Sequence, residues 1–290
     1  MSPTFFTPLR YPGGKGKLAE YIKAIIKENG LVGGVYVEPY AGGAAVAIEL
    51  LLLDYVGEIH INDLNRSVYA FWHQVLNNAD MLIERIQATT VSMDEWFIQK
   101  KIQLDPNAGL EDLAFSTFFL NRCNRSGILK GGVIGGKEQT GRWKLDARFN
   151  KNDLINRIRR ISRHSDRITL HNRDAGQLVK ELSKELPAKS LFYLDPPYYV
   201  KGKGLYDSFY LHDDHVQVSK IVRQLKKQKW IVSYDDVPEI KQMYPGCSAI
   251  RYRLSYSAQT REQGGEVMFF ASSLAIPLVP KSAPMHMIAA

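Results

Sequence analysis

Cysteine is scarce in this sequence, and its scarcity excludes a disulfide-stapled fold. Cys123 and Cys247 are the only two cysteines among 290 residues, and neither has a partner at the spacing of a metal site. Small secreted scaffolds depend on a much higher cysteine content. Two isolated thiols are typical of a reducing compartment, so we expect a cytoplasmic protein.

Long apolar runs are absent too. No stretch approaches the roughly 18 consecutive apolar residues of a transmembrane helix, although 45% of the residues are hydrophobic. Residues 1–17 lack the apolar core that follows the basic start of a secretory signal. These observations predict a globular protein with neither a membrane anchor nor a leader.

Negative charge is in short supply relative to positive charge. The chain has 38 Lys or Arg and 30 Asp or Glu, a net charge of +8. Residues 121–167 hold 13 basic and four acidic side chains, so this stretch accounts for the whole excess. Such a basic block fits a polyanion such as nucleic acid. A solvated, arginine-rich helix face gives the same count, and charge alone leaves both interpretations open.

Hydrophobic patterning predicts an α/β fold in two separated parts. Residues 35–37 and 58–63 have the pattern of strands, with a glycine turn and an apolar helix between them. That unit is the first half of a doubly wound sheet. Strand and helix patterns alternate again after residue 165, and the last two strands suggest an antiparallel pair. The later strands are expected at 167–174, 191–195, 230–236, 249–256 and 266–272.

The segment between the two halves has a different character. It is rich in helical patterns and then in glycine and basic residues, which predict a loop or hairpin around residues 131–136. We therefore expect a discontinuous α/β domain at 1–65 and 166–277, with an inserted, mainly helical domain at 66–165. Residues 278–290 carry prolines and no periodicity, so we expect a flexible tail there.

An acidic strand end followed by two glycines marks a candidate ligand site. In VEPYAGG, the strand delivers Glu38 to the sheet edge, while Gly42 and Gly43 let the backbone approach a ligand closely. Asp63 lies 20 residues beyond Gly43 at the next strand end, a spacing that suits the binding of ribose hydroxyls. The pattern G-x-G-x-x-G is absent, and a tight turn without a ligand remains the alternative.

The sequence LFYLDPPYY ends an apolar strand with an acid, two prolines and two tyrosines. An amine on an aromatic ring is a poor nucleophile, because its lone pair is delocalised into the ring. In a turn stiffened by Pro196 and Pro197, the Asp195 carboxylate and the Pro196 carbonyl can each accept one amino hydrogen, while Tyr198 stacks on the ring. A proline-rich loop capped by Asp195 is the alternative interpretation.

Further candidate residues flank these motifs. RYPGGKGK places Tyr11 and Lys15 at a rigid turn, where an aromatic face and a cation can cap a small ligand, although an ordinary turn explains it equally. Asp174 follows a strand and either lies near a cofactor or caps the next helix. Three further tyrosines either line a ligand pocket or simply pack, namely Tyr199, Tyr206 and Tyr210.

Taken in this order, the motifs resemble those of the Dam-type adenine-specific DNA methyltransferases, the α-group amino-methyltransferases with a DPPY motif. YPGGK, EPYAGG, IND and DPPY match motifs of that family, and FFLNRCNRSGIL with GRWKLDARFNK resembles its DNA-contacting segment. The resemblance extends from Pro8 to about Phe270. Ala44 departs from it, because many relatives carry a second spaced glycine at that position.

The resemblance implies a Rossmann-like sheet that binds S-adenosylmethionine, an inserted target-recognition domain, and an adenine flipped out of duplex DNA. The catalytic loop would be Asp195, Pro196, Pro197 and Tyr198. The cofactor-binding set would be Tyr11, Lys15, Glu38, Pro39, Tyr40, Gly42, Gly43, Asp63, Asp174 and Asp195. The DNA-binding candidates are Arg122, Arg125, Lys130, Lys137, Arg142, Lys144 and Arg148. Because the sulfonium is already activated, we expect no metal.

The resemblance also sets the expected partners and the rival functions. It implies double-stranded DNA as substrate, a monomer or weak dimer, and a prokaryotic or phage setting, and it leaves open a cognate restriction endonuclease. The rivals are methylation of another amine, in RNA adenine, in cytosine or in a glutamine side chain of a protein, and a catalytically inactive DNA-binding relative. By family resemblance, Asp rather than Asn at position 195 argues against the glutamine acceptor. The intact set of Tyr11, Lys15, Asp63 and Asp195 argues against the inactive relative.

Overall fold

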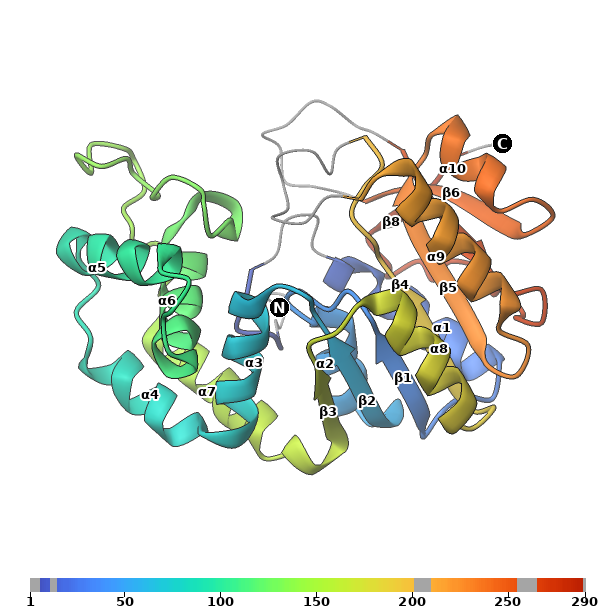
Figure 1. Cartoon of the computed structure of the whole chain (residues 1–290), viewed down its shortest axis with the longest axis horizontal. Helices are drawn as coiled ribbons and strands as arrows, with labels where there is room; N and C mark the ends of the chain where they lie inside the picture. The colour runs from blue at the N-terminus through green and yellow to red at the C-terminus, as the bar shows by residue number, and fades with distance from the viewer. Residues whose placement is uncertain (1–5, 11–14, 201–209, 255–264, 289–290) are drawn as a thin grey trace.

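The computed structural model describes residues 6–10, 15–200, 210–254 and 265–288 (Figure 1). A central sheet has helices on both faces, and a lobe of helices projects beyond one edge of the sheet. Tyr11 and Tyr206 lie outside the described residues. Within the described ranges, no helix combines the length and the apolar character needed to cross a bilayer.

In the described ranges the sheet has eight strands, in the order β3-β2-β1-β4-β5-β7-β6-β8. The parallel strands are β1 (Gly34–Glu38), β2 (Val56–Asn62), β3 (Ile168–His171), β4 (Ser190–Leu194) and β5 (Lys229–Asp235). Beyond them, β7 (Glu266–Phe270) lies antiparallel between β5 and β6 (Ser248–Leu254). The order reverses between β1 and β4, as in doubly wound folds. The predicted Rossmann-like fold and its antiparallel pair are confirmed.

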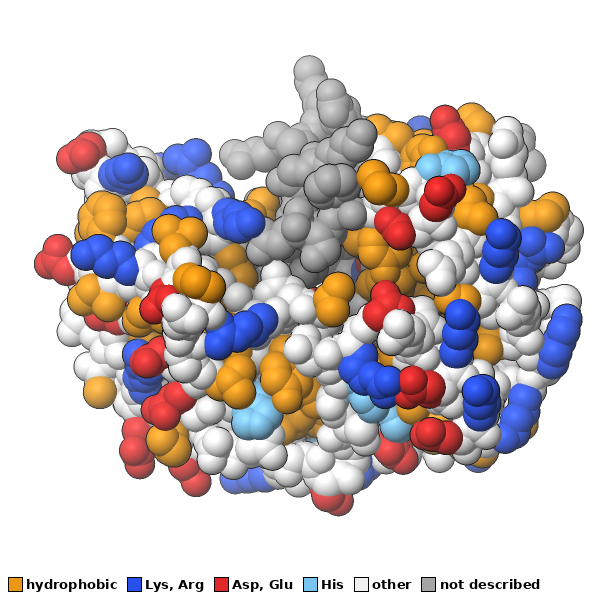
Figure 2. All heavy atoms as spheres, in the orientation of Figure 1, with side chains coloured by type: hydrophobic (Ala, Val, Ile, Leu, Met, Phe, Trp, Pro, Cys, Tyr) orange, Lys and Arg blue, Asp and Glu red, His pale blue; other side chains and the backbone are white. Residues whose placement is uncertain are grey.

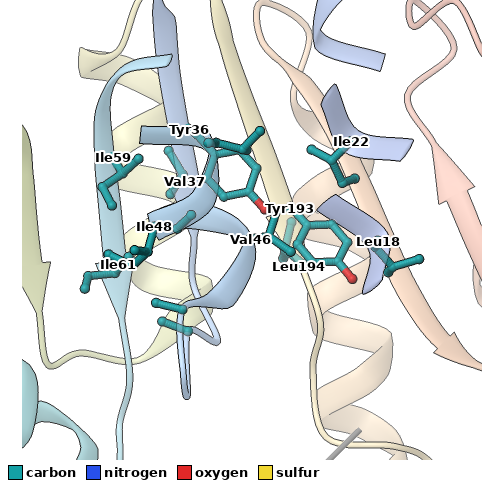
Figure 3. Packing of buried hydrophobic residues seen from close by; sticks show 14 of the residues in the cluster. Leu18, Ile22, Tyr36, Val37, Val46, Ile48, Ile59, Ile61, Tyr193 and Leu194 are labelled. Carbon is teal, nitrogen blue, oxygen red and sulfur yellow. The ribbon is translucent and has the colours of Figure 1, made fainter. Parts of the chain in front are cut away.

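Helices cover both faces of this sheet. On one face lie α1 (Ala19–Glu28) and α2 (Ala45–Leu52); on the other lie α8 (Ala175–Glu185) and α9 (His212–Gln224), with the short α10 (Pro238–Met243) beside α9 (Figure 1). Leu18 and Ile22 approach Tyr193 of β4 and Tyr36 of β1, with Val46 of α2 alongside (Figure 3). All five of these side chains are fully buried. A densely packed core thus supports β1 and β4 on the face of the sheet that α1 and α2 cover.

The projecting lobe consists of α3 (Arg66–Asn77), α4 (Ala79–Ala88), α5 (Met93–Leu104), α6 (Leu110–Cys123) and α7 (Lys151–Ser162). Every residue of α6 from Leu113 onward is buried, because α3, α4 and α5 all pack against this helix. Phe118 contacts Phe71 and Phe149 at ring-centroid distances of 6.1 and 5.4 Å. The helical character expected for residues 66–165 is present, and their role in target recognition stays a prediction.

Two expectations about boundaries were wrong. β3 ends at His171 rather than at Asp174, and the Asp174 carboxylate instead caps α8 by accepting a hydrogen bond from the Gln177 N–H at 2.9 Å. The tail is not free of structure either, because β8 (Met285–Met287) pairs with β6 and the Met285 side chain is buried. This pairing satisfies backbone groups of β6 that would otherwise form an exposed sheet edge.

Candidate active site

The carboxyl ends of the parallel strands bring several acids together. β1 ends with Glu38, β4 directly precedes Asp195, and β5 ends with Asp235. β1 and β4 are hydrogen-bonded neighbours, and doubly wound sheets bind ligands where the strand order reverses in this way. The glycine turn and the DPPY loop therefore meet at one edge of the sheet, although 152 residues separate Gly43 from Asp195.

Asp63 organises the glycine turn. Its Oδ2 accepts a hydrogen bond from the Gly42 N–H at 2.9 Å, and its Oδ1 accepts one from the Asn65 N–H at 2.9 Å. Burial raises the pKa of Asp63 to about 6. Gly42 has a φ of 47°, in the left-handed region that glycine adopts without steric strain. Since each carboxylate oxygen has two acceptor sites, both oxygens can still accept hydrogen bonds from a ligand.

Ala44, the departure from the family pattern, keeps the backbone of a glycine. Its φ is 46° and its ψ is 35°, and its side chain is fully buried. A left-handed conformation costs an L-residue roughly 1–2 kcal/mol. The turn that leads into α2 therefore has the shape that a second glycine would give it, at a small cost in strain.

Glu38 lies beneath the turn, and its carboxylate is committed to the start of α2. The residue is 4% exposed, and its Oε2 accepts a hydrogen bond from the Ala47 N–H at 3.1 Å. Burial raises the pKa of Glu38 to about 8, with the Asp195 charge acting in the same direction. This environment favours a supporting role for Glu38, and its direct contact with a cofactor stays a prediction.

Asn62, at the end of β2, was not among the expected residues. Its side-chain amide donates hydrogen bonds to the carbonyls of Pro39 at 2.8 Å and Arg173 at 3.0 Å, and its Oδ1 accepts one from the Arg173 N–H. One buried amide thereby ties together the segments that follow β1, β2 and β3, which include Pro39 and Tyr40 of the predicted cofactor set.

An aromatic group lies beside these segments. The hydroxyls of Tyr40 and Tyr210 are 3.0 Å apart, and the rings of Tyr199 and Tyr210 both pack against His215. Burial raises the pKa of Tyr40, and the nearby Tyr210 acts in the same direction. The structure thus brings Tyr199 and Tyr210 together, whereas the Asp174 carboxylate caps α8; contacts of all three with base or cofactor stay predictions.

Asp195 is oriented by a chain of hydroxyls. Ser233 Oγ donates a hydrogen bond to Asp195 Oδ1 at 2.7 Å, and the Tyr193 hydroxyl lies 2.9 Å from Ser233 Oγ. The Lys15 ammonium is 3.4 Å from the same Oδ1. Burial raises the pKa of Asp195, while Lys15 and Ser233 oppose that rise. Since both neighbours approach Oδ1, the second oxygen, Oδ2, is the one best placed for a substrate.

Lys15 joins the N-terminal motif to the DPPY loop. It begins the 3₁₀ turn η1 (Lys15–Leu18), and its ammonium donates hydrogen bonds to the Tyr198 hydroxyl and to Glu266 Oε2, both at 2.7 Å. The Tyr198 hydroxyl in turn donates to Glu266 Oε1 at 3.0 Å. The structure therefore brings the predicted Lys15, Asp195 and Tyr198 together and adds Glu266, which the sequence did not indicate.

Asp235 anchors the far end of the DPPY loop. Its Oδ1 accepts a hydrogen bond from the Tyr199 N–H and its Oδ2 accepts one from the Val200 N–H, each at 2.9 Å. Pro196 and Pro197 have no N–H to donate, so the loop is fixed through the residues that follow them. Asp235 ends a strand, and the rule that identified Asp195 could also have identified this residue.

Six of the seven DNA-binding candidates are exposed on the helical lobe, and Arg122 is the exception. The Arg122 guanidinium donates to the carbonyls of Arg148 at 2.7 Å and Pro8 at 3.4 Å, and burial lowers its pKa to about 9. Its burial contradicts the expectation that it contacts phosphate. The exposed candidates are Arg125, Lys130, Lys137, Arg142, Lys144 and Arg148.

The exposed basic residues come from the long segment between α6 and α7, which begins with η2 (Arg125–Gly127). Lys and Arg side chains gather on the upper part of the helical lobe (Figure 2). Trp143 was not predicted; it is 64% exposed, and the Arg142 guanidinium lies 5.4 Å from its ring centroid. An aromatic among exposed arginines is suited to nucleic-acid bases.

Comparison with known proteins identifies the family of the chain. The chain is 26% identical over 239 residues to the Type II methyltransferase M.MjaIII of Methanocaldococcus jannaschii. The aligned region covers 76% of this chain and 80% of that protein. Two structures of the rRNA methyltransferase AviRa from Streptomyces viridochromogenes are 12% and 10% identical to it, with TM-scores of 0.42 and 0.38. These two cover 91% and 87% of this chain, and the chain covers 87% and 84% of them. The family model for D12 class N6 adenine-specific DNA methyltransferases matches residues 11–258, and the chain therefore belongs to that family.

Proposed function

We propose that this enzyme transfers the methyl group of S-adenosylmethionine to the exocyclic nitrogen of an adenine flipped out of duplex DNA, with Asp195–Tyr198 as its catalytic loop. The observation that carries the proposal is the position of Asp195. Ser233 of β5 donates a hydrogen bond to its Oδ1, and Asp195 itself directly follows β4, beside the glycine turn that follows β1. An acceptor and a cofactor turn are thus adjacent at the point where the strand order reverses.

The residues around the glycine turn fit S-adenosylmethionine by the chemistry of their donors and acceptors. The Asp63 carboxylate keeps acceptor sites for ribose hydroxyls beyond the two N–H groups that it already holds. Gly42 and Gly43 carry no side chain that would block a close approach of the ligand, and Tyr40 contributes an aromatic surface. When bound, S-adenosylmethionine supplies a methyl group on a positively charged sulfur.

Asp195 would activate the adenine amine by accepting one of its hydrogens through Oδ2, while the Pro196 carbonyl accepts the other. Two such bonds would favour a tetrahedral nitrogen, whose lone pair is no longer delocalised into the ring and is available for attack on the methyl carbon. With S-adenosylmethionine bound, the amine nitrogen would accept the methyl group as the carbon–sulfur bond breaks, and it would then lose a proton toward Asp195 and solvent. Tyr198 would stack on the ring and fix its plane.

The exposed basic residues of the helical lobe would hold the duplex while the base leaves the stack, which costs a few kcal/mol. Arg125, Lys130, Lys137, Arg142, Lys144 and Arg148 are the candidates. If all six meet phosphates, log K against log salt should have a slope of about −5. Trp143 is a further candidate for contact with bases.

The name of the relative from Methanocaldococcus jannaschii supports a further proposal about biological setting. We infer that the chain modifies DNA within a type II restriction–modification pair, with a cognate endonuclease that cuts the unmethylated site. A monomer suffices for methylating one strand at a time, so we propose a monomer or weak dimer acting in a prokaryotic or phage-infected cytoplasm.

The test is a comparison of methyl acceptors. Purified enzyme is incubated with radiolabelled S-adenosylmethionine and with matched samples of duplex DNA, the corresponding RNA, and protein. The proposal predicts label in duplex DNA that digestion maps to N6-methyladenine at one short sequence. Label confined to RNA, to protein or to cytosine would overturn it, and so would DNA binding without transfer.

A further inference from the structure

We propose that Glu266 is a positioning residue that draws the Lys15 ammonium away from Asp195, so that the Asp195 carboxylate stays available to the substrate amine. The inference deepens the proposed methyl transfer and depends on it. Glu266 comes from β7, a strand outside the parallel part of the sheet, and is 251 residues from Lys15 in sequence.

The distances show which acid holds the cation. The Lys15 Nζ lies 2.7 Å from Glu266 Oε2 but 3.4 Å from Asp195 Oδ1. Charge-assisted N–H···O bonds have lengths of about 2.7–2.9 Å, so the pair with Glu266 is a strong hydrogen bond and the contact with Asp195 is a loose ion pair. The Lys15 and Glu266 side chains are only 10% and 7% exposed, so water screens their interaction little.

Removing the Glu266 charge would change the partner of Lys15. The ammonium has three hydrogens to donate, and two of them go to Glu266 and Tyr198. Without Glu266, Asp195 is the nearest carboxylate, and a short Lys15–Asp195 pair would hold negative charge at Oδ1 and weaken Oδ2 as an acceptor. A buried cation left without its partner is costly, so this shift is favoured.

The same carboxylate also fixes Tyr198. Its Oε1 accepts a hydrogen bond from the Tyr198 hydroxyl, and in the antiparallel ladder Glu266 pairs directly with Asp235. Asp235 holds the backbone of Tyr199 and Val200. Asp235 and Glu266, which pair across β5 and β7, thus both support the DPPY loop. Asp235 binds the backbone of the loop, whereas Glu266 binds the Tyr198 hydroxyl and Lys15.

The primary test measures methyl transfer by Glu266→Gln, with Glu266→Asp as the conservative variant. We expect kcat of Glu266→Gln to fall about 10- to 100-fold, with a much smaller change in KM for DNA, and Glu266→Asp to recover most of the loss. Glu239→Gln, an exposed acid on α10, is the matched control and should keep wild-type kcat.

The pH profile separates positioning from a merely structural role. Burial and the Glu266 charge raise the pKa of Asp195, whereas Lys15 and Ser233 lower it. In Glu266→Gln the raising charge is gone and Lys15 moves closer, so the acidic limb of kcat against pH should move to lower pH. A variant that is only partly folded would show a lower plateau with the limb unmoved, and that result would overturn the inference.

A double-mutant comparison keeps the inference testable even if Glu266→Gln folds poorly. Glutamine keeps an oxygen that can accept the Tyr198 hydrogen bond, and the proposed effect on Asp195 depends on Lys15, so adding Glu266→Gln to Lys15→Met should change kcat less than about 3-fold. An additional loss of 10-fold or more in the Lys15→Met background would overturn the inference. If the wild-type enzyme methylates no adenine in DNA, the proposed function itself fails, which is a different outcome from a fully active Glu266→Gln.

Discussion

Arg122 lies in the basic stretch 121–167 but is buried, so its substitution distinguishes a structural role from a contact with DNA. We predict that Arg122→Met destabilises the fold but leaves phosphate contacts intact, because the guanidinium is buried and bound to backbone carbonyls. Methionine keeps most of the apolar stem and removes the charged donor. Arg142, which is exposed on the same lobe, provides the matched control as Arg142→Met.

The size of the effect follows from the bonds lost. The Nε bond to the Arg148 carbonyl is short at 2.7 Å, while the Nη1 contact with Pro8 at 3.4 Å is weak. A hydrogen bond from a charged group contributes about 1.5–3 kcal/mol. Relief from the nearby positive charges of Arg10 and Arg157, which help to lower the pKa of Arg122, offsets part of this. We expect a loss of about 1–3 kcal/mol, or a Tm lower by about 2–5 °C.

The assay combines thermal unfolding with DNA affinity at several salt concentrations. Arg122→Met should lower Tm and leave the slope of log K against log salt unchanged, whereas Arg142→Met should keep Tm and reduce the magnitude of that slope by about 1. A wild-type Tm together with a shallower salt slope in Arg122→Met would show instead that Arg122 contacts phosphate.

Two further predictions concern the supports of the active site. Burial raises the folded-state pKa of Glu38 to about 8, so the contribution of Glu38 to stability falls as pH rises from about 4.5 to 8. The Tm of Glu38→Gln minus the Tm of the wild type should therefore increase between pH 5 and pH 8. A Tm difference that does not change with pH would contradict the raised pKa of Glu38. Asp235→Ala removes the acceptors for the N–H groups of Tyr199 and Val200, so kcat should fall about 10-fold or more. Calorimetry should show little change in the Kd for S-adenosylmethionine. An unchanged kcat would show that other contacts hold the DPPY loop.

Strand-end acids were the part of the site that sequence could predict. Glu38, Asp63 and Asp195 each follow an apolar strand, and in a parallel sheet such positions share one edge. The strand end before Asp174 was misplaced, because the pattern does not reveal that the strand stops at His171, and the helix cap, given as one of two interpretations of Asp174, is present in the structure. A cap and a strand end have the same local composition.

The residues that sequence reasoning missed depend on contacts distant along the chain. Glu266 follows a glycine pair before an apolar strand, and its partners Lys15 and Tyr198 lie 251 and 68 residues away. Arg122 belongs to a helix that is buried on all sides, whereas a charge count treats every arginine as exposed. β8 has only three residues, too few for a periodic signal to separate it from a disordered end.

The most direct measurement is the single-turnover rate of methyl transfer by Asp195→Ala, compared with the Kd of the variant for S-adenosylmethionine. We expect a rate at least about 1,000-fold below wild type, within the range that positioned acceptor groups supply, and a Kd within a few-fold of wild type, since the glycine turn and Asp63 remain in place. Methyl transfer to adenine at the wild-type rate would show that Asp195 is not the acceptor for the amine.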